Sequence, residues 1–381
     1  MDLISVIVEN LQVFASYILP FLFVLTVIVF FHELGHFAVA RWCGVKVEIF
    51  SVGFGPEIWG FDDRKGTRWK FAWIPLGGYV KFAGDDNAAS VPDRDQIEHM
   101  SKEDREGNFH TKKVWQRAAV VAAGPIANFI LAIVIFAFIF AVVGRQVIAP
   151  RVDSVQANSA AAVAGFKADD VILAIGSKKI ESFADMQRII SSSADKELEI
   201  TVDRQGETLV LVATPQRKEI TDRFGNKIRI GLLGISRNAA KEEVKTIRAD
   251  PLTAVVMGTE ETYFMIVRTL EYLKDIVVGR EEADQLGGPL RIAQISGQVA
   301  TISFIALLNL AALLSVNIGL INLFPVPMLD GGHLMYYAVE ALRGKPLSER
   351  VQDFGFKIGL VLVLMLMVFA TWNDLVHFSI F

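Results

Sequence analysis

Four long apolar stretches constrain this chain more than any other feature. They centre on residues 17–40, 118–143, 301–324 and 354–375. The hydrocarbon core of a bilayer is about 30 Å thick, and a helix needs about 20 mainly apolar residues to cross it. With 52% hydrophobic residues, the 381-residue chain is also more apolar than most soluble proteins. The sequence therefore predicts a polytopic α-helical membrane protein with about four transmembrane helices.

The positive charges indicate how these helices are oriented. No Lys or Arg precedes Arg41 or follows Lys357, whereas the loop after the first apolar stretch is rich in both. Since positively charged loops stay in the cytoplasm, we expect this loop inside and both chain termini outside. The absence of positive charge before the first stretch argues against a cleavable signal peptide. The lipid bilayer is thus an expected partner. The small net charge of -4, with no basic block, argues against nucleic acid.

The apolar stretches divide the chain into regions of different composition. The outer segment contains LEITVDRQGETLVLVATP, which alternates like two strands around the turn RQGE. The later segment PLTAVVMGTEETYFMIVRTLEYLKDIVVGR is amphipathic, and we expect it along the membrane surface. The expected regions are 1–144 (two transmembrane helices and a cytoplasmic loop), 145–217 (an α+β domain), 218–300 (a linker and amphipathic helices) and 301–381 (the last two transmembrane helices).

The cytoplasmic loop predicts a β-hairpin. Its segments VKVEIFSVGFGP and TRWKFAWIPLGGYVKF alternate like strands, with Gly77 and Gly78 as a turn. Trp69, Phe71 and Trp73 are spaced by two, which favours contact with the membrane over an ordinary solvated hairpin. The edge of such a hairpin could pair with an extended peptide.

The motif His32-Glu33-Leu34-Gly35-His36 stands at the end of the first apolar stretch. On a helix, residues four apart lie about 40° apart on one face, so His32 and His36 can bind one zinc ion. Glu33 is placed to polarise a zinc-bound water without binding the metal itself. Two packing histidines are the alternative, but they leave a costly carboxylate in an apolar span without a partner.

A catalytic zinc needs a third protein ligand, and the chain after His36 turns into strand and glycine patterns. The best candidate is Asp330, in NIGLINLFPVPMLDGG near the end of the third apolar stretch. Pro325 and Pro327 should end the helix there, and Gly331 next to Asp330 permits close approach of the backbone. The sequence thus predicts a zinc site made of His32, His36 and Asp330.

Three motifs together resemble the site-2 protease family of intramembrane zinc metalloproteases. They are FFHELGH in the first stretch, GPIANF in the second and NLFPVPMLDGGH in the third. The outer segment PRVDSVQANSAAAVAGFKADDVILAIGSKKIESFADMQRII looks like a PDZ domain, and this order of parts resembles the bacterial regulator-of-sigma-E protease branch. Well-known members of that branch carry two tandem PDZ domains, whereas this segment has room for one.

The resemblance implies specific roles. His32, His36 and Asp330 would bind Zn²⁺, and Glu33 would act as the catalytic base and proton shuttle. Asn322 would hydrogen-bond the substrate backbone or the developing oxyanion, and Asn317 is a weaker candidate for substrate binding. The implied location is a bacterial inner membrane with both termini periplasmic. The implied substrates are single-span membrane proteins already trimmed on the outer side, cleaved in regulated intramembrane proteolysis, such as anti-sigma factors or remnant signal peptides.

Two other functions compete with intramembrane proteolysis. One is a non-proteolytic metal-binding scaffold or transporter whose PDZ domain recruits partners; it has no need for Glu33 between two ligands. The other is a soluble-type zinc protease on membrane anchors, which the position of HELGH within the first apolar stretch opposes. Asn128 and Asn309, in the second and third stretches, could simply tie helices together.

Overall fold

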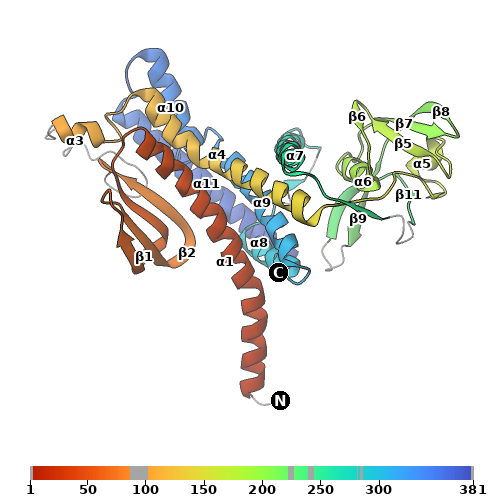
Figure 1. The fold of residues 1–381 in the computed structure, drawn as a ribbon, viewed down its shortest axis with the longest axis horizontal. Helices are drawn as coiled ribbons and strands as arrows, with labels where there is room; N and C mark the ends of the chain where they lie inside the picture. The colour runs from red at the N-terminus through yellow and green to blue at the C-terminus, as the bar shows by residue number, and fades with distance from the viewer. Residues whose placement is uncertain are drawn as a thin grey trace. The chain divides into compact units, whose positions relative to one another are not determined.

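A computed structural model describes residues 3–85, 102–221, 227–238, 244–280, 282–283 and 286–378. The chain forms two compact units. Unit 1 comprises Met1–Ile139 and Val255–Phe381, and unit 2 comprises Phe140–Ala254. Figure 1 shows the elements of both units along the chain. Each unit has its own structure and is described separately below.

Four helices in the described part of the chain are long and apolar enough to cross a membrane. These candidate spans are Phe14–Trp42, Val114–Val143, Phe304–Asn322 and Arg350–His377. They coincide with the four apolar stretches, so the prediction of a polytopic helical membrane protein is confirmed at that level. They lie in the helices α1 (Leu3–Trp42), α4 (Val114–Phe138, continued by a π-helical turn over Ile139–Val143), α9 (Phe304–Asn322) and α11 (Glu349–His377).

Shorter helices complete unit 1. They are α3 (Lys102–Gly107), α7 (Pro251–Val277, which begins in unit 2), α8 (Pro289–Ala300) and α10 (Asp330–Arg343). Helix α1 packs against α4 and α8, and α4 packs in turn against α9 and α10. Figure 1 shows the C-terminal part of α1 lying beside α4. This packing brings together the helices that carry the three sequence motifs.

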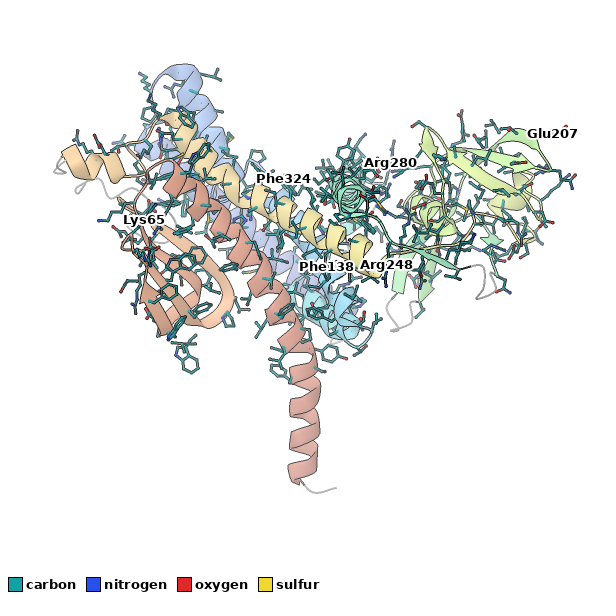
Figure 2. The ribbon with its side chains drawn as sticks, in the orientation of Figure 1. Lys65, Phe138, Glu207, Arg248, Arg280 and Phe324 are labelled. Carbon is teal, nitrogen blue, oxygen red and sulfur yellow. The ribbon has the colours of Figure 1, made fainter. Side chains whose placement is uncertain are left out.

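Two long strands fill the loop between α1 and α4, as predicted. They are β1 (Val47–Asp62) and β2 (Arg68–Phe82), and they pair antiparallel. The turn between them lies at residues 63–67, where Lys65 projects from the surface (Figure 2), and not at Gly77 and Gly78. Both glycines belong to β2, which folds back between Ala72 and Gly78, because Val52 of β1 pairs with Phe71 and also with Gly78. The predicted turn at Gly77 and Gly78 thus lies at this second reversal, where Gly77 has φ 147°.

The hairpin folds back on itself. Phe50 of β1 pairs with both Trp69 and Val80, so the first part of β1 lies between the two ends of β2. Gly53, with φ 93°, provides the bend in β1 at a backbone angle that few other residues adopt. The last part of β2, around Val80, therefore forms an edge with no second strand partner among the described residues.

The hairpin is attached to the helices by a buried apolar cluster. It includes Phe50, Phe82 and Phe109 together with Val120 of α4. Trp69 stacks on Phe50 with ring centroids 4.2 Å apart, so this tryptophan faces inward. By contrast, Trp73 is 68% exposed. Of the three aromatic residues predicted to contact the membrane, Trp69 thus packs against the cluster, whereas Trp73 is exposed.

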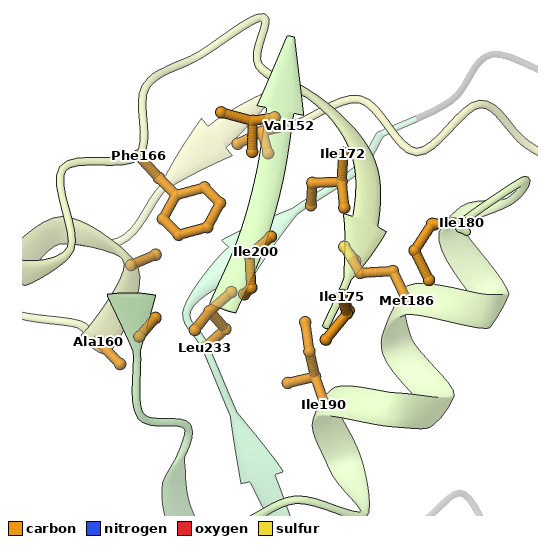
Figure 3. Close-up of a cluster of buried hydrophobic side chains, with 13 residues drawn as sticks. Val152, Ala160, Phe166, Ile172, Ile175, Ile180, Met186, Ile190, Ile200 and Leu233 are labelled. Atoms are coloured by element: carbon orange, nitrogen blue, oxygen red, sulfur yellow. The ribbon is translucent and has the colours of Figure 1, made fainter. Parts of the chain in front are cut away.

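Unit 2 is an α+β structure built on a four-stranded antiparallel sheet of order β6-β5-β7-β8. Its helices are α5 (Ala160–Val163) and α6 (Phe183–Ser191). Its strands are β3 (Arg145–Val147), β4 (Ser154–Val155), β5 (Val171–Ile175), β6 (Lys178–Lys179), β7 (Leu198–Arg204), β8 (Glu207–Ala213), β9 (Gln216–Thr221), β10 (Lys227–Leu232), β11 (Ile235–Ser236) and β12 (Lys245–Ile247). Figure 3 shows its core, in which Ile172, Ile200 and Met186 meet.

The predicted hairpin in LEITVDRQGETLVLVATP is confirmed. Strands β7 and β8 pair from Leu198 to Ala213 around Gln205 and Gly206, which have φ 57° and 90°. Positive φ at both turn residues is typical of a tight type I′ hairpin. Glu207, the first residue of β8, projects from the surface (Figure 2).

Unit 2 extends further than the region 145–217 that the sequence suggests. Strand β11 pairs with β4, and β12 pairs with β3. Two strands beyond residue 217 therefore pair with strands near the start of the unit. The compact unit ends at Ala254. Short strands of two or three residues carry too little alternation to reveal such pairings in a sequence.

Candidate metal centre

Three side chains from distant parts of the chain converge in unit 1. Suitable ligand atoms of His32, His36 and Asp330 all lie within 4.8 Å of one another. The Nε2 atoms of the two histidines are 3.2 Å apart. The Asp330 carboxylate oxygens are 3.3 Å from His32 Nε2 and 3.6 Å from His36 Nε2. The structure thus brings together all three residues that the sequence predicts as ligands.

Helix α1 presents both histidines toward α4, and glycines make this close approach possible. A Cβ atom on Gly35 would overlap the backbone oxygen of Ala123 on α4. A Cβ atom on Gly124 would overlap the His36 imidazole and come within 2.9 Å of His32. Gly35 of HELGH and Gly124 of GPIANF are therefore required by packing, since any larger residue would separate the two helices.

The backbone of α4 also fixes the orientation of one ligand. His36 Nδ1 lies 2.9 Å from the backbone oxygen of Val120. A carbonyl oxygen can only accept, so Nδ1 carries the hydrogen, and in the neutral ring Nε2 then presents a lone pair. That lone pair points toward the ring nitrogen of His32 and the carboxylate of Asp330.

Asp330 enters from a sharp turn between two helices. Helix α9 ends at Asn322, as the prolines predict, and α10 begins at Asp330 itself. A Cβ atom on Gly331 would overlap the backbone oxygens of Leu323 and Phe324, so this turn also depends on glycine. Met328 within it has φ 94°, a strained backbone angle for a residue with a side chain.

The residues fit a metal ion. Two imidazoles and one carboxylate are the ligand set of a catalytic zinc site with one open position. His36 Nε2 and the carboxylate of Asp330 lie 3.6 Å apart, and a metal cation between them would make the contact of a lone pair with a carboxylate favourable. No other group of three such ligands occurs among the residues that the structure describes.

A cavity of about 230 Å³ opens beside the three ligands. Its lining residues are His32, Glu33, His36, Gly78, Tyr79, Val80, Phe82, Phe109, Val121, Asn322, Met328, Leu329, Asp330, His333 and Tyr337. Glu33 is bound to the edge of the hairpin through a backbone hydrogen bond with Val80. A Cβ atom on Gly78 would come within 3.3 Å of Glu33 Cγ. Glu33 thus faces the cavity between the metal ligands and the free edge of β2.

Two titratable residues of α10 also line the cavity. Burial lowers the pKa of His333, which keeps its imidazole neutral. Burial raises the pKa of Tyr337 to about 12, although the Arg117 guanidinium, 4.8 Å from the ring centre, opposes this shift. Tyr337 therefore remains a protonated phenol at neutral pH.

The two predicted asparagines occupy different places. Asn322, at the end of α9, lines the cavity. Asn317 does not line it: its amide oxygen accepts a hydrogen bond of 2.9 Å from Thr269 of α7. The structure therefore places Asn317 in a helix–helix contact, while Asn322 lies within reach of a bound substrate.

Sequence reasoning missed several residues around the centre. Asn128, for which the sequence favours a helix tie, lies with its amide nitrogen 3.2 Å from His32 Nδ1. His110 pairs with the buried Asp85 at 2.8 Å. Its neighbour Phe109 stacks on Phe82 to form one wall of the cavity. Asp85 and His110 are too far apart in sequence for any local pattern to reveal them.

Comparison with known proteins agrees with this geometry. The family model described as "Peptidase family M50" matches residues 20–366. A protein of Agrobacterium fabrum named as a zinc metalloprotease is 51% identical over 360 residues, which cover 94% of this chain and 96% of the relative. A Rhizobium meliloti protein with the same kind of name is 50% identical over 372 residues, covering 97% and 98%. Metalloprotease MmpA of Caulobacter vibrioides is 42% identical over 390 residues, covering 97% of both chains.

Long apolar helices that carry a two-histidine, one-carboxylate centre define the class of polytopic membrane metallopeptidases. The match over most of its length shows that this chain belongs to peptidase family M50. Family membership and the ligand set agree on zinc as its cofactor. The family resemblance expected from the three motifs is confirmed at this level.

Proposed function

We propose that this chain is an intramembrane zinc metalloprotease that cleaves the transmembrane segments of single-span membrane proteins. One observation carries the proposal. His32, Glu33 and His36 lie within the candidate span Phe14–Trp42, and they meet Asp330 beside a cavity. A peptidase with its ligands in such a span is suited to substrates that are themselves in the membrane.

The chemistry divides between the metal and the protein. Bound zinc would supply Lewis-acid polarisation of the scissile carbonyl and a water of lowered pKa. Glu33 does not belong to the ligand group but faces the same cavity. Its carboxylate can take a proton from the attacking water and deliver it to the leaving amine. The Asn322 amide can donate to the carbonyl oxygen as negative charge develops there.

A substrate helix must unwind before its peptide bonds can react, because its carbonyls are engaged in the helix itself. The edge of β2 offers replacement hydrogen bonds. Gly78, Tyr79 and Val80 line the cavity, and this part of β2 has no second strand partner among the described residues. An extended substrate segment could add to this edge beside Glu33. The exposed Trp73 is suited to contact lipid at the hairpin.

Unit 2 supports a role in substrate selection. Its α+β structure is compatible with the single PDZ domain that its sequence resembles, and that domain would read or exclude the outer part of a substrate. The proposed substrates are single-span proteins already trimmed on the outer side, as in the regulator-of-sigma-E branch. The proposed location is the bacterial inner membrane, with both termini periplasmic.

The direct test is Glu33→Gln in the full-length protein, reconstituted with a single-span substrate whose outer part has been removed. We expect this variant to bind one zinc ion like the parent and to lose cleavage by at least about 10³-fold. Glu48→Gln on the hairpin is the matched control and should cleave normally, because Glu48 pairs with Lys81 at the surface.

Asp330→Ala should lose zinc, since it removes one of three ligands. Full zinc retention by that variant would exclude Asp330 as a ligand. Cleavage by Glu33→Gln at the parental rate would refute the mechanism and favour the alternative, a metal-binding scaffold or transporter without proteolysis.

A further inference from the structure

Asn128 of α4 contacts His32 at Nδ1, the ring nitrogen that does not face Asp330. Its side chain is completely buried, and its Nδ2 atom lies 3.2 Å from His32 Nδ1. Its Oδ1 atom is also buried, and it has no hydrogen-bond partner in the part of the chain that the structure describes. A buried acceptor without a partner costs free energy, so this amide needs an explanation.

The explanation lies in what a histidine ligand requires. His32 directs Nε2 toward His36 Nε2 at 3.2 Å and toward the Asp330 carboxylate at 3.3 Å. Nitrogen that binds a metal must offer a lone pair, so in the neutral ring Nδ1 carries the hydrogen. An Nδ1–H group needs an acceptor, and an amide nitrogen cannot accept. The amide oxygen of Asn128 can.

We propose that Asn128 is a positioning residue of the zinc centre, whose Oδ1 accepts the hydrogen on His32 Nδ1. A half-turn of the amide about its Cβ–Cγ bond exchanges Nδ2 and Oδ1 without moving any other atom. The half-turn places Nδ2 in the buried position that Oδ1 leaves, and it fixes His32 in the tautomer that leaves Nε2 free for the metal. The inference rests on the proposed zinc function.

The surroundings of Asn128 hold it in place for this role. Its backbone oxygen accepts a hydrogen bond of 2.8 Å from Ser315 of α9. A Cβ atom on Gly319, also on α9, would come within 3.2 Å of Asn128 Cβ. Helix α9 therefore restricts where the Asn128 side chain can go.

Helix α4 then orients both histidines in the same way. Val120 supplies a backbone acceptor to His36 Nδ1, and Asn128 supplies a side-chain acceptor to His32 Nδ1. Gly124 lies midway between them and makes room for both rings. Residues 120, 124 and 128 are four apart, so they lie along one face of the helix. The motif GPIANF thus contains Gly124 and Asn128, whereas Val120, which orients His36, precedes it by one helical turn.

The test compares two substitutions of similar size. Asn128→Leu removes the acceptor, whereas Asn128→Asp keeps oxygen atoms that can accept from Nδ1. In the full-length protein, we expect Asn128→Leu to bind zinc about 10- to 100-fold more weakly in competition with a chelator, and Asn128→Asp to stay close to the parent. The Co²⁺-substituted protein should show an altered visible spectrum only for Asn128→Leu.

Asn309→Leu is the control, because Asn309 lies on an exposed part of α9 and should leave zinc binding unchanged. Melting temperatures separate a general loss of folding from a local change at the metal. Equal zinc affinity and spectra for Asn128→Leu and the parent would overturn the inference, as would equal losses in the Leu and Asp variants. A parent protein that binds no zinc would instead refute the proposed function itself.

Discussion

Gly359 of α11 lies directly against the backbone oxygen of Pro327, in the turn that leads to Asp330. A Cβ atom at position 359 would overlap this oxygen. One turn earlier, a Cβ atom at position 355 would overlap the Tyr336 hydroxyl. Helix α11 therefore packs on the turn that carries Asp330, the proposed third metal ligand, and the spacing Gly355-x-x-x-Gly359 makes this contact possible.

We expect Gly359→Ala to displace the Pro327 turn, since a backbone oxygen can move only with its peptide unit. Overpacking of this kind costs about 1–3 kcal/mol. Because Asp330 follows three residues later, zinc affinity should fall together with the melting temperature. Both can be measured on the purified protein by chelator competition and thermal unfolding.

Gly355→Ala is the comparison for that experiment. It meets only the end of the Tyr336 side chain, which can swing aside, so its effect should be clearly smaller. Val361→Ala, at a 65% exposed position of the same helix, should have almost no effect on zinc. If Gly359→Ala bound zinc as tightly as Val361→Ala, the α11 contact would have no bearing on the metal site.

The sequence singled out the three converging residues His32, His36 and Asp330 because each one is marked by local chemistry. HELGH combines a helical spacing with ionisable groups in an apolar stretch, and Asp330 follows two helix-ending prolines. Asn128 and Gly124, which contact the two histidines, were not predictable in the same way. Asn128 and Gly124 gain their roles only when α4 packs on α1, because packing between distant segments leaves no periodic pattern. The fold shows the same division: long spans and hairpins were predictable, but the β11 and β12 pairings were not.

Asp374 ties the other end of α11 to α8. Its carboxylate is fully buried and accepts backbone hydrogen bonds from Gly288, Leu290 and Arg291 at 2.7, 3.0 and 3.1 Å. It thus caps the start of α8, whose first N–H groups have no partner within the helix. Asp374→Ala would leave these donors buried, at about 1–3 kcal/mol for each one unsatisfied.

We expect the amides of Gly288, Leu290 and Arg291 to exchange hydrogen faster in Asp374→Ala, as measured by mass spectrometry. Thr371→Ala is the control, because the Thr371 hydroxyl bonds only to Met367 of its own helix and is exposed. Unchanged exchange at 288–291 in Asp374→Ala would show that α8 is held by other contacts.

Unit 2 should show a pH dependence set by Asp170 and Arg204. Burial acts to raise the pKa of Asp170, but two hydrogen bonds from Arg204, at 2.7 and 2.8 Å, and one from the Lys167 backbone outweigh it and lower the pKa. Because the folded pKa lies below the unfolded value of about 3.9, the interaction stabilises the unit above about pH 4. The stabilisation is lost as the pH falls through the folded pKa.

Arg204→Gln should therefore lower the melting temperature of the protein at pH 7 and have a smaller effect near about pH 3. Calorimetry across this range measures the difference. Arg217→Gln is the surface control: Arg217 pairs with the more exposed Asp195, and such pairs contribute little. An Arg204→Gln effect of the same size at both pH values would contradict the assigned role of Asp170.

The pair of Asp85 and His110 supports the cavity wall without touching a metal ligand. Asp85 accepts hydrogen bonds from His110 Nε2 at 2.8 Å and from the Phe82 backbone at 3.0 Å. These bonds hold Phe82 and Phe109 in a stack, with ring centroids 4.9 Å apart, against the cavity.

We expect His110→Leu to loosen this stack and so to raise KM for a membrane substrate several-fold, by about 1 kcal/mol of lost binding. Zinc stoichiometry and affinity should stay at the parental values, because neither Asp85 nor His110 is one of the three proposed ligands. Steady-state kinetics in detergent micelles, with zinc content measured on the same samples, check both expectations. A fall in zinc content with unchanged KM would instead mean that the pair acts on the metal ligands.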